Sequence, residues 1–289
     1  MEALGNLISL LNDWLYSYIL IILLIGLGIY FTFKIKFGQF KLIGHMFKLM
    51  TEAVEVVDGK RGISPFEAFC ISAASRIGTG NIAGVAIAIA TGGPGAVFWM
   101  WIIALIGGAT SFIESTLGQI YKVKDGDTFR GGPAYYIEQA LDKRGLGVFF
   151  SILTAVTFGF IFNSVQANTI ASSFERAFGL KPIMVGVILL IITGIVIFGG
   201  VKRIANVSSK IVPVMATIYI LVALFIMIKD IALVPKMFGM IISNAFGAKA
   251  AFGGAMGAAI MNGVKRGLFS NEAGMGSVPN AAATAHTSH

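Results

Sequence analysis

A short polar pattern, Arg-x4-Asn-x-Ala-Gly, occurs twice in an otherwise strongly apolar chain. The first copy runs from Arg76 to its asparagine at Asn81, and the second from Arg266 to Asn271. Each copy interrupts a membrane-length apolar stretch with glycine and small polar residues. Such interruptions free backbone N–H and C=O groups, which lipid cannot satisfy, so they persist where they are buried in protein or line a cavity. A matched pair of interrupted spans indicates the substrate and ion site of a secondary transporter. Residues 78–81 and 269–271 are therefore expected to leave regular helix and to approach each other near the bilayer midplane.

The composition places the chain in a membrane. Of its 289 residues, 56% are hydrophobic and only 12% are charged, whereas about a quarter of an average soluble domain is charged. The formal net charge of +8 is therefore interpreted as loop topology and not as nucleic-acid binding. Cys70 is the only cysteine, which excludes an internal disulfide and a cysteine-based metal cluster. The sequence has no Walker motif and no HExxH zinc motif.

Apolar runs of about 20 residues are long enough to span a bilayer. They predict an all-α polytopic protein with seven spans, at residues 14–33, 65–91, 96–121, 147–174, 182–200, 211–228 and from 252 onward. Residues 40–57 are expected to form an interfacial amphipathic helix, and residues 229–250 a connector. Lysine and arginine gather in the loops that share a side with residues 34–61, so the positive-inside rule places the N-terminus outside. No cleavable leader is expected.

The two interrupted spans, the second and the seventh, then cross the membrane in opposite directions, which is the mark of an inverted repeat. The predicted organisation has three parts: an extra helix and an interfacial helix at 1–64, a complete five-helix repeat at 65–229, and the start of a second repeat at 230–289. Because the second repeat holds only its first helix, the sequence is expected to be a truncated form that does not transport alone.

Four segments carry a resemblance to a known family. Residues 92–107 read GGPGAVFWMWIIALIG, and supporting segments lie at 75–84, 129–136 and 267–277. The chain resembles the alanine or glycine:cation symporter family, the sodium:alanine symporters. The resemblance implies a LeuT-like fold of two inverted five-helix units preceded by one extra helix. It also implies sodium-driven uptake of alanine or glycine across the plasma membrane. No nucleic acid is expected as a partner, and the oligomeric state stays open.

An amino-acid substrate needs donors for its carboxylate and acceptors for its ammonium, and the ends of a broken helix supply both. The N–H groups of Thr79 and Gly80 are therefore expected to bind the carboxylate. Ser270 is expected to serve the substrate or the ion, and Phe269 to wall the side-chain pocket. The predicted sodium ligands are Gly78, Asn81 and Ser270. The alternative at each position is a simple kink or ordinary core packing.

The fourth span adds polar residues among phenylalanines. Phe162, Gln166 and Thr169 share one helical face. Gln166 can donate and accept, so it suits either end of a zwitterion, and it is predicted to bind substrate together with Phe162. The alternative for Gln166 is an interhelical hydrogen bond, which is common in membranes.

Charges inside spans are costly and are expected to be paired. Arg76 and Arg266, with Glu272 and Glu114 as candidate partners, are predicted to act as a gate or as structural ties. Two other functions compete with the symporter. One is a passive channel that uses the glycine-rich breaks as a filter, and the other is an intramembrane enzyme with Glu114 and Glu272 as acid and base.

Overall fold

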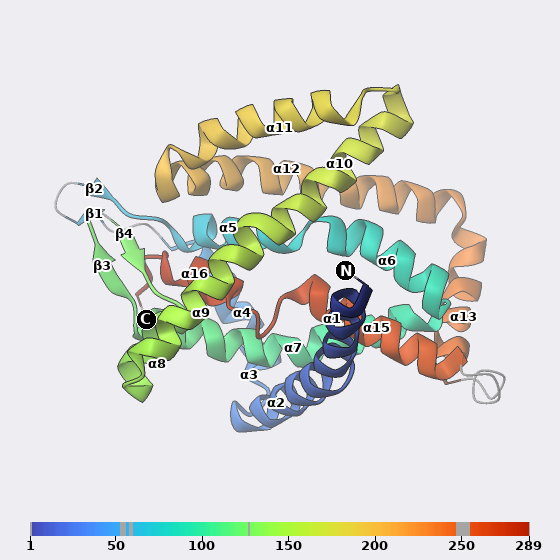
Figure 1. Ribbon diagram of the computed structural model, residues 1–289, viewed down its shortest axis with the longest axis horizontal. Helices are drawn as coiled ribbons and strands as arrows, with labels where there is room; N and C mark the ends of the chain where they lie inside the picture. Colours follow the sequence, from blue (N-terminus) through green and yellow to red (C-terminus); the bar gives the residue numbers. More distant parts are fainter. Residues whose placement is uncertain (1, 53–55, 58–59, 127, 247–254, 289) are drawn as a thin grey trace. The chain divides into compact units, whose positions relative to one another are not determined.

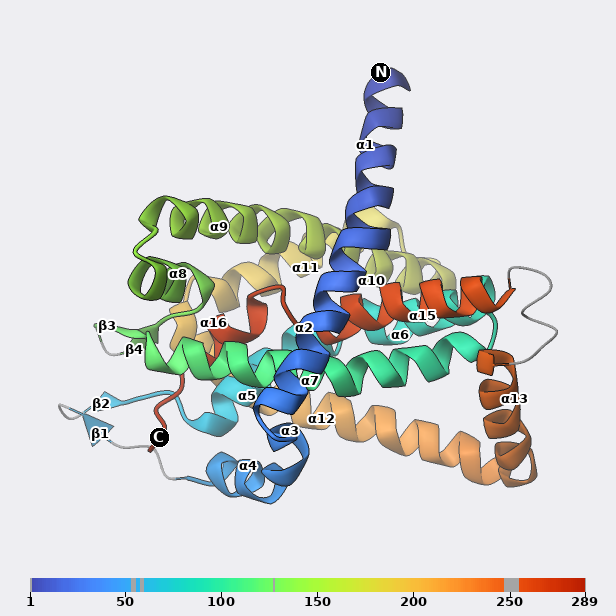
Figure 2. The same ribbon diagram turned by 90° about the horizontal axis from the view of Figure 1, so that it is seen from below.

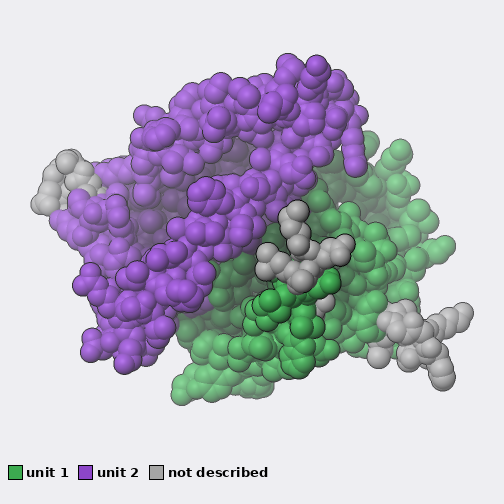
Figure 3. Space-filling model, in the orientation of Figure 1, with its two compact units in different colours: residues 1–43, 80–113, 219–275 green, residues 44–79, 114–218, 276–289 purple. Residues whose placement is uncertain are grey.

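The computed structural model describes residues 2–52, 56–57, 60–126, 128–246 and 255–288. By internal contacts the chain divides into two compact units (Figure 3). Unit 1 comprises residues 1–43, 80–113 and 219–275, and unit 2 comprises residues 44–79, 114–218 and 276–289. Both units are built from segments distant in sequence, so the division does not follow the expected boundaries after residues 64 and 229. The inverted repeat stays a prediction.

Unit 1 begins with one long helical run, visible in blue in Figure 2. The run consists of α1 (Glu2–Trp14), the π-helical turn η1 (Leu15–Leu20) and α2 (Ile21–Lys34). The short helix α3 follows at Gly38–Lys41. The rest of unit 1 contains most of α6 (Thr79–Gly92), the first part of α7 (Gly95–Ile120), the end of α12 (Gly200–Lys229), η3 (Ile231–Leu233), α13 (Val234–Phe246) and α15 (Ala255–Asn271).

Unit 2 contains most of α4 (Ile43–Met50) and the whole of α5 (Pro65–Arg76). A second long helical run consists of α9 (Arg144–Val156), the π-helical turn η2 (Thr157–Phe162) and α10 (Asn163–Phe178). Helix α10 packs against α11 (Pro182–Ile197), as Figure 1 shows at its upper edge. The remaining helices are α8 (Pro133–Leu141), the start of α12 and α16 (Ser277–Ala283).

Two segments differ from the sequence-based expectation. The expected interfacial helix at 40–57 ends at Met50, and Val56–Val57 instead pairs antiparallel with Lys60–Arg61 as strands β1 and β2; residues 53–55 lie outside the described residues. The segment after the third predicted span, for which no strand was predicted, forms a second hairpin, in which β3 (Val123–Asp125) pairs with β4 (Thr128–Arg130). Valines and short polar turns favour extended pairing over a helix at both places.

Among the described residues, four helices are long and apolar enough to cross a membrane: Pro65–Gly92, which combines α5 and α6, Gly95–Ile120, Arg144–Phe178 and Gly200–Lys229. Three shorter apolar helices lie at Tyr18–Lys34, Pro182–Ile197 and Ile231–Phe246. The first two correspond to predicted spans, and the third lies in the predicted connector, for which a short helix on the membrane was expected. The start of the seventh predicted span, at 252, and the end of the connector lie outside the described residues. Large apolar side chains such as Leu190 and Phe225 are exposed, which suits lipid and not water.

Small residues allow close packing inside each unit. In unit 1, Ile103 of α7 forms a buried cluster with Val264 and Leu268 of α15, and side chains of α2 pack against it. A second cluster joins Ala88 of α6 to Ala96 and Met100 of α7. In unit 2, Ile63, Ala68, Ala205 and Ala285 form the corresponding core. Helices of a membrane protein approach closely where such small residues meet.

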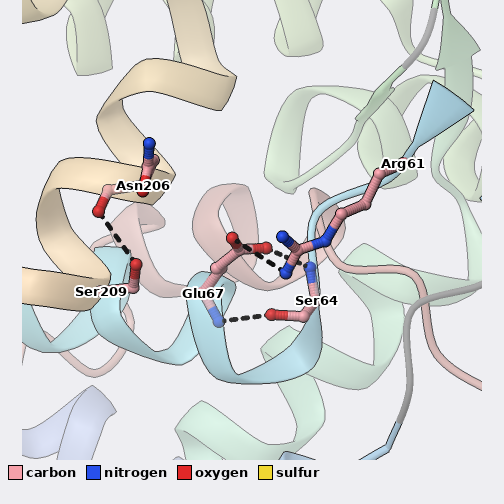
Figure 4. A network of polar contacts seen from close by, with 5 residues as sticks. All are labelled: Arg61, Ser64, Glu67, Asn206 and Ser209. Atoms are coloured by element: carbon pink, nitrogen blue, oxygen red, sulfur yellow. Dashed lines mark hydrogen bonds and ion pairs between the residues drawn. The ribbon is translucent and has the colours of Figure 1, made fainter.

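Helix α5 begins with a complete capping box (Figure 4). The Glu67 backbone N–H donates to Ser64 Oγ over 3.0 Å, and the Ser64 N–H donates to a Glu67 carboxylate oxygen over 2.8 Å. Arg61 pairs with the same carboxylate at 3.5 Å. This reciprocal cap satisfies donors that a helix start leaves unpaired, so it fixes the start of the first interrupted span.

The segment after α16 is tied to the end of α7 within unit 2. Lys122 Nζ donates to the Ala285 carbonyl over 2.8 Å and to Gln119 Oε1 over 2.6 Å, and it lies 4.3 Å from the centre of the Phe129 ring. Burial lowers the pKa of Lys122 below the ordinary lysine value. In helix α8 of the same unit, burial and then the charge of Glu114 raise the pKa of Tyr136.

Candidate functional site

The first copy of the polar motif breaks its helix before the asparagine. Helix α5 ends at Arg76 and α6 begins at Thr79, so Ile77 and Gly78 form the interruption. The expectation that residues 78–81 all leave the helix is therefore corrected, because Thr79, Gly80 and Asn81 already form the first turn of α6. Their N–H groups lie at the positive end of a helix dipole, as the sequence-based model of carboxylate binding requires.

The second copy breaks its helix after the asparagine. Helix α15 continues through Phe269, Ser270 and Asn271, and the chain leaves the helix at Glu272. Glu272, Gly274 and Gly276 adopt left-handed backbone with φ of 53°, 82° and 86°. The expected interruption at residues 269–271 is therefore corrected to residues 272–276. Two of the three left-handed positions are glycines, which carry no Cβ penalty there.

In unit 1 the structure brings together two predicted sodium ligands. The hydroxyl of Ser270 in α15 donates to Asn81 Oδ1 in α6. Phe269 lies beside Gly80, because a Cβ added to that glycine would come within 3.0 Å of the Phe269 ring. Asn81, Ser270 and Phe269 are all half-buried, and Gly80 is buried. The predicted approach of the two interrupted helices is thus observed at these residues.

In unit 2 the structure brings together three other predicted residues. The Thr79 N–H donates to Gln166 Oε1 of α10 over 3.2 Å. A Cβ added to Gly78 would come within 2.6 Å of Gln166 Nε2, so the glycine allows the amide to approach the break. Thr79 Oγ1 is buried and has no hydrogen-bond partner among the described residues. Buried hydroxyls are normally paired, so an unpaired one at a helix start is a candidate ligand contact.

The remaining predicted residues are not placed in a common site. Phe162 ends the π-helical turn η2 and stacks on Phe158 with ring centres 4.8 Å apart. Arg76 and Arg266 are half-buried, in α5 and α15 respectively, and Glu272 is 3% exposed. A gate role for these charges stays a prediction. Thr169 Oγ1 donates to the Val165 carbonyl of its own helix.

The sequence did not reveal the polar contacts of Asn271. Its Nδ2 donates to the Ile103 carbonyl of α7 over 3.2 Å, and its Oδ1 accepts from the Ala273 N–H over 2.8 Å. Gly107 lies beside this amide. Gly107, the last residue of the segment at 92–107, and Gly108 directly after it were a visible signal, but the sequence alone does not say which glycine faces α15.

A small cavity of about 10 Å³ lies near this contact in unit 1, with room for about one water molecule. It is lined mainly by apolar side chains of α2, α7 and α15 and by Thr110. The Thr110 hydroxyl is buried and has no hydrogen-bond partner within the described part of the chain. With a single side-chain oxygen, the cavity does not provide the several oxygen ligands that a hard cation needs.

Comparison with known proteins places the chain in context. A model of the sodium:alanine symporter family matches residues 1–289. The chain is 56% identical over 288 residues to the probable sodium/glutamine symporter GlnT of Bacillus subtilis, covering 100% of this chain and 60% of GlnT. It is 54% identical over 290 residues to the amino-acid carrier protein AlsT of the same organism, covering 100% and 62%.

A more distant relative is the sodium/alanine symporter AgcS of Methanococcus maripaludis, which is 42% identical over 292 residues, covering 98% of this chain and 64% of AgcS. The chain thus spans about three-fifths of the length of these curated relatives.

Proposed function

The chain belongs to the sodium:alanine symporter family, and from this premise we propose that it takes part in sodium-coupled uptake of small neutral amino acids, alanine or glycine. The family is one of integral membrane transporters and not of enzymes, which removes the enzyme alternative. Alternating access around the interrupted helices is the proposed mechanism, with a LeuT-like arrangement of two inverted repeats.

The observation that carries the proposal is the contact between Ser270 and Asn81. It joins two neutral side-chain oxygens from two interrupted helices. Ser270 lies one residue before the end of α15, where the negative end of the helix dipole favours a cation. Two neutral oxygens and nearby helix-end carbonyls suit a monovalent cation, because they provide ligands without excess negative charge. We therefore assign Asn81 and Ser270 to sodium, with the Gly78 carbonyl as a further candidate.

The substrate carboxylate is assigned to the start of α6. The Thr79 N–H already donates to an oxygen atom, Oε1 of Gln166, so an oxygen of another group can reach this donor. A substrate carboxylate would replace that oxygen, and the Gln166 amide would rotate to donate to the carboxylate. The unpaired Thr79 hydroxyl offers an additional donor. Gly80 is proposed to add its N–H, and Phe162 and Phe269 to line the side-chain pocket.

The choice between alanine and a larger substrate is open to a direct test, because relatives are named for both alanine and glutamine. The contact of Phe269 with Gly80 leaves little room beside the start of α6. This close packing supports a small substrate. Competition of labelled alanine uptake by glycine and by glutamine would separate the two: glycine should compete, and efficient competition by glutamine would contradict a small pocket.

The N-terminus is proposed to lie outside, because lysine and arginine concentrate in the opposite set of loops. Labelling a cysteine placed at Leu7 with a membrane-impermeant reagent tests this orientation, with Cys70→Ser as background. Reaction only after the membrane is opened would reverse the topology.

The central experiment is uptake of labelled alanine into liposomes, for this chain and for a form extended to the length of its relatives. A symporter concentrates alanine when sodium is higher outside, and it stops when the gradient is removed. A channel, the competing function, would let alanine or ions equilibrate downhill and would never concentrate them. If the extended form lets alanine equilibrate across the liposome membrane without accumulating it, the proposed symport is contradicted.

A further inference from the structure

Asn271 is the last residue of α15, and both ends of its side-chain amide are engaged. Its Nδ2 donates to the Ile103 carbonyl in the middle of α7, and its Oδ1 accepts from the Ala273 N–H two residues onward. The first bond joins two helices and the second closes a local turn of the kind that asparagine side chains form. One residue therefore ends α15 and attaches that end to α7, whose course beside α15 is visible in Figure 2.

Gly107 provides the space for this amide. A Cβ added there would lie 2.6 Å from Asn271 Nδ2 and 3.2 Å from the Ala273 Cβ. The next residue, Gly108, would meet nothing within 4 Å. Gly107 is buried and Gly108 only partly so. Of two adjacent glycines on one helix, only the first faces the end of α15.

Close packing of α15 against α7 surrounds the hydrogen bond from Asn271 to Ile103. Gly267 of α15 approaches α7 closely, because an added Cβ would come within 3.1 Å of the Ile103 Cβ. Ile103 and Leu268 are both nearly fully buried. Beyond Asn271 the backbone turns left-handed at Glu272 and Gly274. Helix α15 is thus fixed along its length and is tied at its last residue, where regular hydrogen bonding stops.

We propose that Asn271 is a positioning residue for sodium binding. It holds the last turn of α15 against α7 and thereby fixes the position of Ser270. Gly107 leaves the space that the Asn271 amide occupies. The inference rests on the proposed sodium role of Asn81 and Ser270. Ser270 precedes Asn271 directly, so a shift of this last turn moves the Ser270 hydroxyl relative to Asn81. In this assignment Asn271 acts through Ser270 and not as an ion ligand, since its Nδ2 donates to the Ile103 carbonyl of α7 and its Oδ1 accepts from the Ala273 N–H of the turn.

The test measures two quantities in the extended form: the sodium concentration for half-maximal alanine uptake and the midpoint of thermal unfolding in detergent. The variants are Asn271→Ala, which loses both hydrogen bonds, and Asn271→Ser, whose hydroxyl can keep the local turn but cannot reach α7. Gly107→Ala introduces the methyl group that collides with the amide, and Gly108→Ala is its matched control. The double variant carries Gly107→Ala and Asn271→Ala.

Asn271→Ala and Asn271→Ser should raise the half-saturating sodium concentration by about 5- to 10-fold, as the loss of ordinary hydrogen bonds predicts. In the same variants, the alanine concentration for half-maximal uptake at saturating sodium should differ from that of the parent protein by less than twofold. Gly107→Ala should lower the unfolding midpoint and Gly108→Ala should not. In the double variant, Gly107→Ala should lower the unfolding midpoint by less than it does alone, because its 2.6 Å contact with Asn271 Nδ2 has been removed and only the 3.2 Å contact with the Ala273 Cβ remains.

Three results would overturn the inference. Unchanged sodium dependence in folded Asn271→Ser and Asn271→Ala would show that the bonds only stabilise the fold. Strictly additive decreases of the unfolding midpoint in the double variant would show that Gly107 does not accommodate the Asn271 amide. A parallel rise of the sodium and alanine requirements would indicate general damage to the site. Failure of the parent protein to show any sodium dependence would instead refute the proposed function, and the unfolding comparison would still report on the contact.

Discussion

The two copies of the motif break their helices on opposite sides of the asparagine. In the first copy the interruption at Ile77 and Gly78 comes before Asn81, which therefore lies in the first turn of α6. In the second copy the interruption at residues 272–276 comes after Asn271, which therefore ends α15. The Asn81 side chain meets Ser270 of the other broken helix, whereas that of Asn271 holds a turn and a backbone carbonyl.

The glycines at the two breaks contribute to this difference. Gly78 lies in the first break, and Gly274 and Gly276 lie in the second with positive φ, whereas Gly84 and Gly267 stay inside α6 and α15. Glycine lowers the cost of leaving the helix and of left-handed backbone, so it permits a break at these positions without requiring one. The same asparagine thus falls at a helix start in one copy and at a helix end in the other. A shared motif therefore does not imply a shared role.

The largest expected effect separates the two asparagines directly. Asn81→Ala should raise the sodium concentration for half-maximal alanine uptake by about 10- to 150-fold, because a contact with a charged group contributes about 1.5–3 kcal/mol. The increase should exceed that of Asn271→Ala. Asn163→Ala is the control, because among the described residues the Asn163 amide donates locally, to the Gly159 carbonyl in the preceding turn η2. An equal or larger sodium effect in Asn271→Ala would remove the distinction between the two copies.

The second effect concerns substrate instead of sodium. Gln166→Ala should raise the alanine concentration for half-maximal uptake by about 10-fold or more, since it removes the amide next to the Thr79 N–H. The half-saturating sodium concentration should stay within about twofold, measured at saturating alanine. Thr169→Ala removes a polar group from the same helix that bonds only locally. A sodium shift in Gln166→Ala as large as its alanine shift would contradict the separate roles.

A smaller effect is expected from the glycine that admits Gln166. Gly78→Ala places a methyl group 2.6 Å from the Gln166 amide nitrogen. Because that amide ends a flexible side chain, it can move aside at the cost of about one hydrogen bond, roughly 1 kcal/mol or about fivefold in the alanine requirement. Gly145→Ala, which meets nothing within 4 Å, should leave uptake unchanged. Equal behaviour of both variants would show that the close approach at Gly78 is not needed.

The smallest effect tests the second break through stability. Gly274 and Gly126 both have positive φ, so alanine is strained at both positions by roughly 1 kcal/mol. At Gly274 the new methyl group would also overlap Leu24 of α2, whereas at Gly126 it would meet nothing within 4 Å. Gly274→Ala should therefore lower the unfolding midpoint by about 2–4 °C more than Gly126→Ala. The same midpoint in both variants would mean that α2 does not restrain the break.

The sequence by itself predicted the class of the molecule, because hydrophobic length and glycine placement act locally. The membrane-spanning helices 65–92, 95–120, 144–178 and 200–229 lie where apolar runs were found, and both interruptions fall within or directly after the motifs. The family assignment from residues 92–107 is confirmed by the match over the whole chain. The hydrogen bond between Thr79 and Gln166 was not predicted; both residues were predicted to bind one substrate, and that role stays a prediction.

Only the tertiary structure decided which asparagine meets which atom. The contacts of Asn81 with Ser270 and of Asn271 with Ile103 join residues 189 and 168 positions apart, and no local pattern encodes such separations. Helix α15 packs against α7, and its last residue donates to the Ile103 carbonyl of that helix, so a tertiary contact accompanies the end of α15. Local sequence determines at which residues a helix can end. Burial and tertiary hydrogen bonds then stabilise one of these possible ends over the others.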